Sequence, residues 1–244
     1  MTTLFHSTIV IQRLPSPAVF VAMVALAAFL MPGAGAVAAG VAAVGDTMVY
    51  RVINRYTNET RGVVSYQVDK VDPNRIVASV TSDNSLVEAG RVAIYTDDGN
   101  WMRHAIDSHN VPQTIEFAAE SPAYAFPLTV GKRWSMRAPA RVLQTGETRS
   151  IRIDGAVTGA ERVRVPAGEF DTLKIDRVIY AGDANGFETE TRITHTEWYA
   201  PALRRAVKTE IRSGYLDMRI GRGNRSVRGD WDVHELLEVR PVQP

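Results

Sequence analysis

The chain has 244 residues, no cysteine and a formal charge of +1 at neutral pH, and residues 1–39 carry a single arginine and no carboxylate. Without cysteine there is neither a disulfide framework nor the lipid-attachment residue of a bacterial lipoprotein, so a stable domain needs a hydrophobic core. The remaining chain balances 27 basic against 27 acidic residues, which argues against nucleic acid as a partner, because such proteins carry a basic excess or stripe.

The first predicted element is the apolar run AVFVAMVALAAFLM at 18–31. It is shorter than the roughly 20 residues of a bilayer-spanning helix, and Pro32, Gly33 and several small residues follow it. This pattern predicts a signal peptide over residues 1–39, cleaved within 36–39, and therefore a periplasmic or secreted protein of a Gram-negative-type bacterium. The alternative is an uncleaved N-terminal anchor, which would be the chain's contact with the membrane.

From residue 46 onward the chain consists of short runs rich in Val, Ile, Tyr and Thr, from TMVYRVINRYT (47–57) to DWDVHELLEVR (230–240). Apolar and polar residues alternate within the runs, and turn residues separate them. About a dozen strands at this spacing predict consecutive antiparallel hairpins in one β-rich domain over 40–244. We expect a strongly curved antiparallel sheet or an incomplete β-barrel, with helical structure limited to a turn within 117–126.

The alternation assigns faces in two of the predicted strands. In 187–199 one face carries Phe187, Thr189, Thr191, Ile193, His195, Glu197 and Tyr199, and the other carries Glu188, Glu190, Arg192, Thr194, Thr196 and Trp198. In 231–239 one face carries Trp231, Val233, Leu237 and Val239, and the other carries His234, Leu236 and Glu238. Both strands are expected to be half-buried, with one side toward a core or cavity.

The segment HAIDSH places His104 and His109 on either side of Asp107. Two imidazoles and a carboxylate are possible zinc ligands, but this spacing matches no known metal motif, and two histidines do not make a site. A pair of solvated histidines is the simpler interpretation.

His195 and Glu197 lie two residues apart on one predicted strand, and His234 and Glu235 occur on another. A histidine and a carboxylate can act as a general acid and base only within a water-poor cleft. On the surface of a β-protein such a pair is usually a solvated ladder. The motifs GxSxG, SxxK, GxGxxG and the phosphate-binding loop are absent, so the sequence predicts no catalytic residue, no cofactor and no metal.

Three motifs occur in order: FPLTVGKRW (126–134), VRVPAGEFDTLKID (163–176) and EWYAPALRRAVKTE (197–210). In order and spacing they resemble an uncharacterised group of secreted bacterial proteins with the patterns FPLxxGxxW, VPAGxF and WYAP. The resemblance implies a curved antiparallel sheet like that of periplasmic lipoprotein carriers, with an apolar concave face, and implies no reaction. This chain departs from the group after Pro201, where ALRR stands in a turn that usually contains glycine.

The motif residues are interpreted as structural corner pieces: Gly131, Trp134, Pro166, Gly168, Phe170, Trp198, Tyr199 and Pro201. Glycine and proline at these places suit tight turns, and the aromatic rings suit anchors beside them. We expect Trp134, Phe170 and Trp198 to share one cluster.

Three functional hypotheses follow. The first is a non-enzymatic periplasmic protein that binds an apolar ligand, such as a lipid or acyl chain, or an envelope partner on the concave face, because aromatic residues occur in nearly every predicted strand. The second is an assembly factor of the cell envelope that pairs with a partner through an exposed strand edge. The third is a secreted hydrolase that uses His195 with Glu197 or Glu235.

Overall fold

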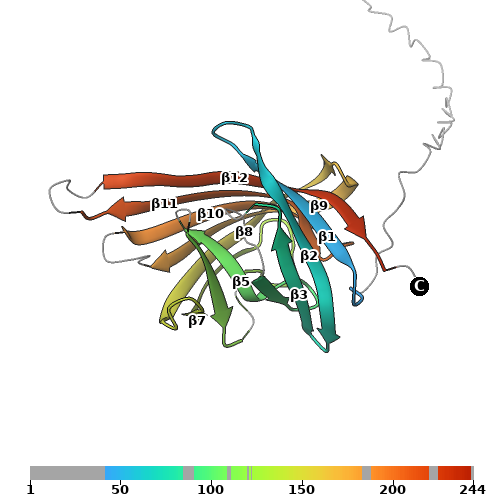
Figure 1. Cartoon of the computed structure of the whole chain (residues 1–244), viewed down its shortest axis with the longest axis horizontal. Helices are drawn as coiled ribbons and strands as arrows, with labels where there is room; N and C mark the ends of the chain where they lie inside the picture. The colour runs from blue at the N-terminus through green and yellow to red at the C-terminus, as the bar shows by residue number, and fades with distance from the viewer. Residues whose placement is uncertain are drawn as a thin grey trace, which may run out of the picture. The chain divides into compact units, whose positions relative to one another are not determined.

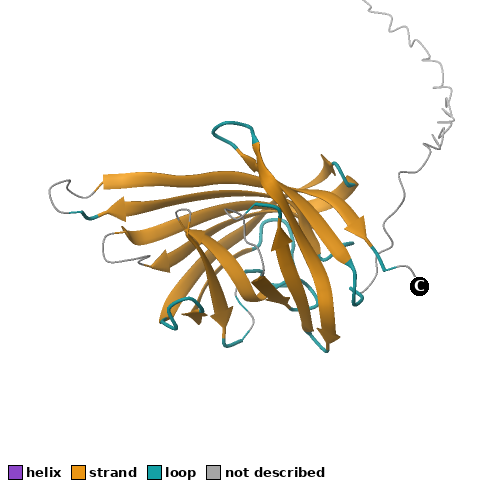
Figure 2. Cartoon of the chain, in the orientation of Figure 1, coloured by secondary structure: helices purple, strands orange, loops and turns teal. Residues whose placement is uncertain are grey.

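The computed structural model describes residues 42–84, 91–108, 111–119, 121, 123–182, 188–219 and 225–242. These residues belong to one compact unit. The described residues form β-strands joined by turns, and none of them forms a helix able to cross a membrane (Figure 2). The strands are β1 (Thr47–Asn54), β2 (Thr60–Asp72), β3 (Arg75–Ser82), β4 (Arg91–Tyr95), β5 (Trp101–Ser108), β6 (Val111–Phe117), β7 (Arg133–Val142), β8 (Thr148–Val165), β9 (Gly168–Gly182), β10 (Glu188–Ala200), β11 (Arg205–Asp217) and β12 (Arg225–Arg240).

The sheet is a closed antiparallel barrel. Each strand pairs with its neighbours in sequence, and β1 also pairs with β12, beside which it lies in Figure 1. The predicted all-β, strongly curved antiparallel fold is confirmed, and the sheet closes rather than remaining an incomplete barrel. Every strand in the described part of the chain has two neighbours. The free strand edge that the assembly hypothesis required is therefore not found there.

Alternation along β10 follows the predicted faces. Residues 191, 193, 195, 197 and 199 are buried, whereas residues 192, 194, 196 and 198 are exposed or half-buried. Successive side chains of a strand point to opposite faces, so this row faces the inside of the barrel. Phe187, which was assigned to the same face, lies outside the described residues.

The predicted faces of β12 are wrong beyond a β-bulge. Its pairing with β1 shifts by one residue between Val49 and Tyr50. An extra residue in one strand inverts the alternation on its far side. As a result His234 and Val239 line the same interior cavity, although simple alternation places them on opposite faces.

Two hydrophobic clusters stabilise the barrel. The larger one draws residues from β1 to β10 and includes Ile115, Ile153, Ile175, Ile179 and Ile193. Burying each such side chain contributes about 1.5–3 kcal/mol. The second cluster consists of Val165, Ala200, Val207 and Leu236. It forms where the tip of the β8–β9 hairpin meets β12, and there the Ala167 amide donates to the Leu236 carbonyl over 3.1 Å.

Two motif glycines lie in turns with positive φ. Gly131 has φ of 91° and Gly168 has φ of 137°, and Pro166 lies in the two-residue turn between β8 and β9. In the turn after Pro201, Arg204 takes φ of 51°, a left-handed conformation that glycine adopts more readily. This chain thus retains a left-handed residue there without glycine.

The expected single cluster of three motif aromatics is wrong. Trp134 packs against the larger core, whereas Phe170 and Trp198 pack against the second cluster. On β8, Trp134 is paired with position 155 and Phe170 with position 163. At roughly 3.3 Å per residue these positions lie about 25 Å apart along the strand. The corner pieces therefore stabilise different parts of the barrel.

Candidate functional site

The barrel encloses a cavity of about 460 Å³ beside the larger core. Its walls come from β1, β2, β3, β5, β10, β11 and β12, and from the turns that follow β4 and β10. The apolar part of the lining includes Met48, Val52, Val64, Tyr66, Ile76, Ala78, Tyr95, Trp101, Leu203, Ile211 and Val239. The cavity reaches the surface where the exposed residues Ala43, Pro241 and Val242 join its lining, beside the beginning of β1 and the end of β12.

Glu197 on β10 forms the polar wall of this cavity with Tyr124 and His195, and it makes a buried ion pair with Arg177 on β9. A guanidinium nitrogen of Arg177 contacts Glu197 Oε1, and their side chains are 0% and 5% exposed. The Tyr124 hydroxyl donates to the other carboxylate oxygen, Oε2, over 2.7 Å. Arg177 Nη1 donates to the Ala123 carbonyl over 2.9 Å, and its guanidinium lies 4.8 Å from the Trp101 ring and 4.7 Å from the Tyr124 ring. The charge pair is thus held between two aromatic rings.

The strand register explains how these groups meet. Arg177 is paired with His195, so it lies diagonal to Glu197 on the inner face. Tyr124 comes from the segment after β6, and Asn100 fixes it in two ways. The Asn100 side-chain Nδ2 donates to the Tyr124 carbonyl over 3.0 Å, and its Oδ1 accepts from the Tyr124 backbone N–H over 2.8 Å.

Electrostatics keep the carboxylate of this wall ionised. Burial alone would raise the pKa of Glu197, but the Arg177 charge, the nearby His195 and the hydrogen bond from Tyr124 outweigh it and lower that pKa to about 2. Burial raises the pKa of Tyr124, as does the adjacent carboxylate. Near neutral pH the wall therefore holds one cation, one anion and a protonated phenol.

Histidines on the cavity wall are uncharged near neutral pH. Burial lowers the pKa of His104 to about 3 and that of His234 to about 4. Burial also lowers the pKa of His195, against the opposing effect of Glu197. The free-energy penalty of removing a charged imidazole from water exceeds the favourable interactions that neighbouring groups offer it.

The structure places the predicted His195 and Glu197 pair together, but in the barrel interior rather than on a solvated ladder. His195 Nδ1 lies 3.6 Å from Glu197 Oε1, which is too long for a good hydrogen bond. Glu235 is on the outside, 2.9 Å from Arg51 and 3.1 Å from Lys208. The acid–base pairing of His195 with Glu235 is therefore contradicted by the geometry, and Glu197 is already engaged by Arg177.

The HAIDSH segment does not form the predicted solvated pair. His104 stacks on Trp101 with ring centroids 4.3 Å apart and lines the cavity. His109 and the Asp107 side chain lie outside what the structure describes. Within the described residues no cluster of three or more His, Asp or Glu side chains could hold a metal ion.

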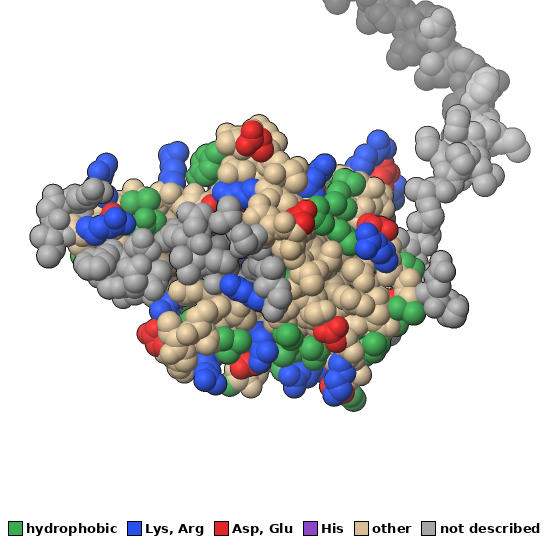
Figure 3. All heavy atoms as spheres, viewed as in Figure 1, with side chains coloured by type: hydrophobic (Ala, Val, Ile, Leu, Met, Phe, Trp, Pro, Cys, Tyr) green, Lys and Arg blue, Asp and Glu red, His purple; other side chains and the backbone are tan. Residues whose placement is uncertain are grey.

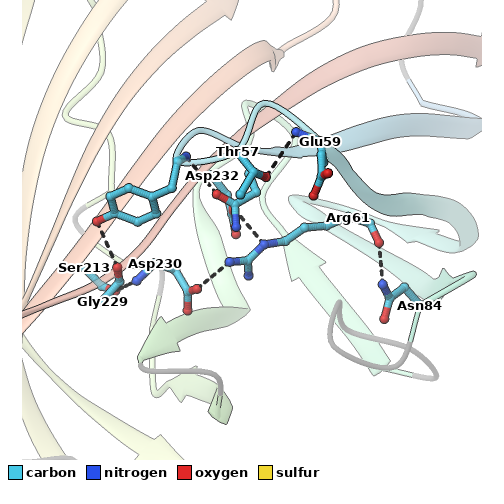
Figure 4. A network of polar contacts seen from close by, with 10 residues as sticks. Thr57, Glu59, Arg61, Asn84, Ser213, Gly229, Asp230 and Asp232 are labelled. Atoms are coloured by element: carbon cyan, nitrogen blue, oxygen red, sulfur yellow. Dashed lines mark hydrogen bonds and ion pairs between the residues drawn. The ribbon is translucent and has the colours of Figure 1, made fainter.

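At another part of the cavity wall, a second charged group joins β2 to β12. Arg61 Nη2 donates to Asp230 Oδ1 over 2.8 Å, and its Nε lies 3.2 Å from Asp232 Oδ1, as Figure 4 shows. The Asp230 amide in turn donates to Ser213 Oγ over 2.9 Å. The Arg61 charge is thus neutralised by two carboxylates.

Arg177 and Tyr124 were not singled out from the sequence. For Arg177 a signal was present: it lies between Ile175 and Ile179, on the apolar face of a regularly alternating strand. A charge in that position predicts a buried partner. The position of Tyr124 carries no comparable signal, because it lies between strands.

The outer surface has a different character from the interior. Lys and Arg side chains are interspersed with Asp and Glu over the face shown in Figure 3, and small apolar areas lie between them. Charged residues of the outer surface also form cross-strand pairs, such as Arg162 with Asp171 at 2.9 Å. Exposed pairs of this kind contribute little stability.

No protein-family model and no curated protein matches this chain. Among solved structures, it is similar to a protein proposed to be a lipoprotein from Parabacteroides distasonis, with 17% identity, a TM-score of 0.46 and coverage of 81% of this chain and 96% of the other. A proposed exported protein with a YmcC-like fold from Bacteroides fragilis has 14% identity, a TM-score of 0.41 and coverage of 81% and 96%. The hypothetical lipoprotein YmcC from Escherichia coli has 11% identity, a TM-score of 0.42 and coverage of 81% and 85%.

Proposed function

We propose that this protein is a non-enzymatic binding protein of the bacterial envelope that holds an apolar ligand, a lipid or a single acyl chain, inside its barrel. The observation that carries the proposal is the cavity of about 460 Å³, which falls within the roughly 300–1,000 Å³ of small-molecule sites. In this proposal the ligand lies within the closed barrel rather than on an open concave sheet.

The composition of the cavity lining supports an apolar ligand. Aliphatic and aromatic side chains from β1, β2 and β3 make up one wall, including Val52, Val64 and Ala78. Transfer of apolar surface from water into such a lining is favourable by roughly 25 cal/mol per Å². The exposed rim at Ala43 and Val242 offers a route of entry.

The polar wall supports binding over catalysis. Glu197 is ionised and paired with Arg177, which leaves it a weak proton acceptor. A general base works best with a pKa near the operating pH, and a pKa of about 2 is far from that range. The envelope location rests on the predicted signal peptide at residues 1–39.

Quenching of tryptophan fluorescence tests the proposal, because Trp101 is the cavity-lining member of the chain's four tryptophans. Addition of a bromine-labelled fatty acyl chain should quench the wild-type protein in a saturable way. The variant Trp101→Phe should lose most of that quenching, whereas Trp231→Phe should keep it. Organic extraction of gently purified protein, followed by mass spectrometry, would identify a lipid that accompanies it.

A variant that fills the cavity provides a second test of ligand binding. Ala78 is 3% exposed and lines the cavity, so Ala78→Phe should reduce acyl-chain affinity at least tenfold. Val130 is 58% exposed in the turn before β7, and Val130→Phe serves as the control. Unsaturable quenching in the wild type, or equal affinity in both variants, would reject the proposal.

A further inference from the structure

Three histidines from separate strands line the cavity: His104 on β5, His195 on β10 and His234 on β12. His104 and His195 both contact the Trp101 ring, with ring centroids 4.3 Å and 5.8 Å from it. The register of β10, β11 and β12 places Glu197, Thr209 and His234 in one cross-strand row. The imidazoles thus gather beside the polar wall.

None of these imidazole rings has a good hydrogen bond to a residue that the structure describes. His195 Nδ1 is fully enclosed without a hydrogen-bond partner among those residues. His104 has ring contacts with Trp101 and Tyr95, and these satisfy neither nitrogen. A neutral imidazole offers one donor and one acceptor, and leaving such groups buried and unpaired is costly. His104 and His234 are half-buried on the cavity wall beside His195, so a ligand in the cavity can supply hydrogen-bond partners to their nitrogens.

The surrounding charges limit what that ligand can carry. Next to the histidines the cation Arg177 is already neutralised by Glu197. An anionic head group would therefore meet the Glu197 carboxylate and lose its hydration without gaining a free cation. A cationic head group would find the Glu197 carboxylate already paired with Arg177, and otherwise only neutral imidazoles. An uncharged hydroxyl meets neither penalty, because it can donate to one nitrogen and accept from another.

On this basis, and resting on the proposed function above, we propose that the bound apolar molecule carries an uncharged hydroxyl or carbonyl group that hydrogen-bonds with His104, His195 and His234. The ligand class is a neutral amphipathic lipid, such as a long-chain alcohol or a monoacylglycerol, rather than a free fatty acid or a phospholipid.

Arg205 is the competing anchor in this cavity. Its guanidinium lies 4.6 Å from the Tyr95 ring and its Nη1 donates to the Arg204 carbonyl over 2.8 Å. It begins β11 and contacts no carboxylate within ion-pair distance among the described residues. Arg205 is the group that an anionic head group would use in place of the histidines, so the experiment must distinguish the two positions.

The test compares 1-dodecanol, 1-monolauroylglycerol, laurate and dodecyl phosphate, which share one tail length, by displacement of a bromine-labelled chain at pH 7.5. We expect the two neutral ligands to bind at least tenfold more tightly than the two anions. In His234→Leu the affinity for dodecanol should fall about two- to tenfold, the effect of one lost hydrogen bond. Glu235→Gln, on the outer face of the same strand, should leave the affinity unchanged.

The outcomes separate the two proposals. If no member of the panel displaces the labelled chain and none binds directly, the apolar-carrier function itself fails. If laurate or dodecyl phosphate binds as tightly as dodecanol, the neutral head group is wrong while the carrier function stands. Loss of that anion binding in Arg205→Gln would then assign the head group to Arg205.

Discussion

Removing the charge of Glu197 is the sharpest test of how the barrel interior is built. In Glu197→Gln the Arg177 side chain, which is 0% exposed, keeps its charge and loses its compensating carboxylate. Leaving one member of a buried pair uncompensated costs roughly 3–5 kcal/mol. Against a typical total of about 5–15 kcal/mol this is a large fraction of the stability of the fold.

Urea denaturation followed by far-ultraviolet circular dichroism measures this change in the free energy of unfolding. The matched control is Glu235→Gln, because Glu235 also pairs with two cations, Arg51 and Lys208, but those side chains are 36% and 29% exposed. The control should lose only about 0.2–1 kcal/mol. Similar losses in the two variants would refute the buried-pair reasoning.

The double variant Arg177→Met with Glu197→Gln distinguishes a lost charge balance from a lost contact. Methionine fills most of the arginine volume and removes the uncompensated cation between Trp101 and Tyr124. We expect it to recover at least half of the stability lost in Glu197→Gln, since buried pairs are often replaceable by apolar groups. A further loss of stability would show that the guanidinium has a role beyond neutralising the carboxylate.

Two further predictions concern pH and packing. His104 and His234 have pKa values of about 3 and 4 in the folded protein and about 6.5 in the unfolded chain. The unfolded chain therefore binds more protons, and the stability should fall as the pH drops from about 6.5 toward 4. A midpoint of thermal unfolding that is constant over that window would contradict the burial of neutral imidazoles. A Cβ added at Gly155 would lie 2.2 Å from the Trp134 ring, whereas one at Gly159 on the same strand meets nothing within 4 Å. Gly155→Ala should therefore cost about 1–3 kcal/mol and Gly159→Ala much less, and equal denaturation midpoints would show that Trp134 moves freely.

The sequence determined the class of fold. Alternation of apolar and polar residues is a local property of strands, and short hairpin turns make successive strands antiparallel neighbours. For that reason the β-rich domain, the inward row of β10 and the positive φ values of Gly131 and Gly168 were predictable. The same alternation would have identified Arg177 as a charge on a buried face.

The tertiary structure decided what the alternation could not. Barrel closure depends on the pairing of β1 with β12, whose residues are separated by most of the chain, and the bulge in β12 inverts its faces without a signal in the residue types. The polar wall depends on contacts between β9, β10 and the segment that carries Tyr124. Sequence periodicity reports which face of one strand is buried, but only the closed barrel decides which buried groups meet and whether a cavity remains between them.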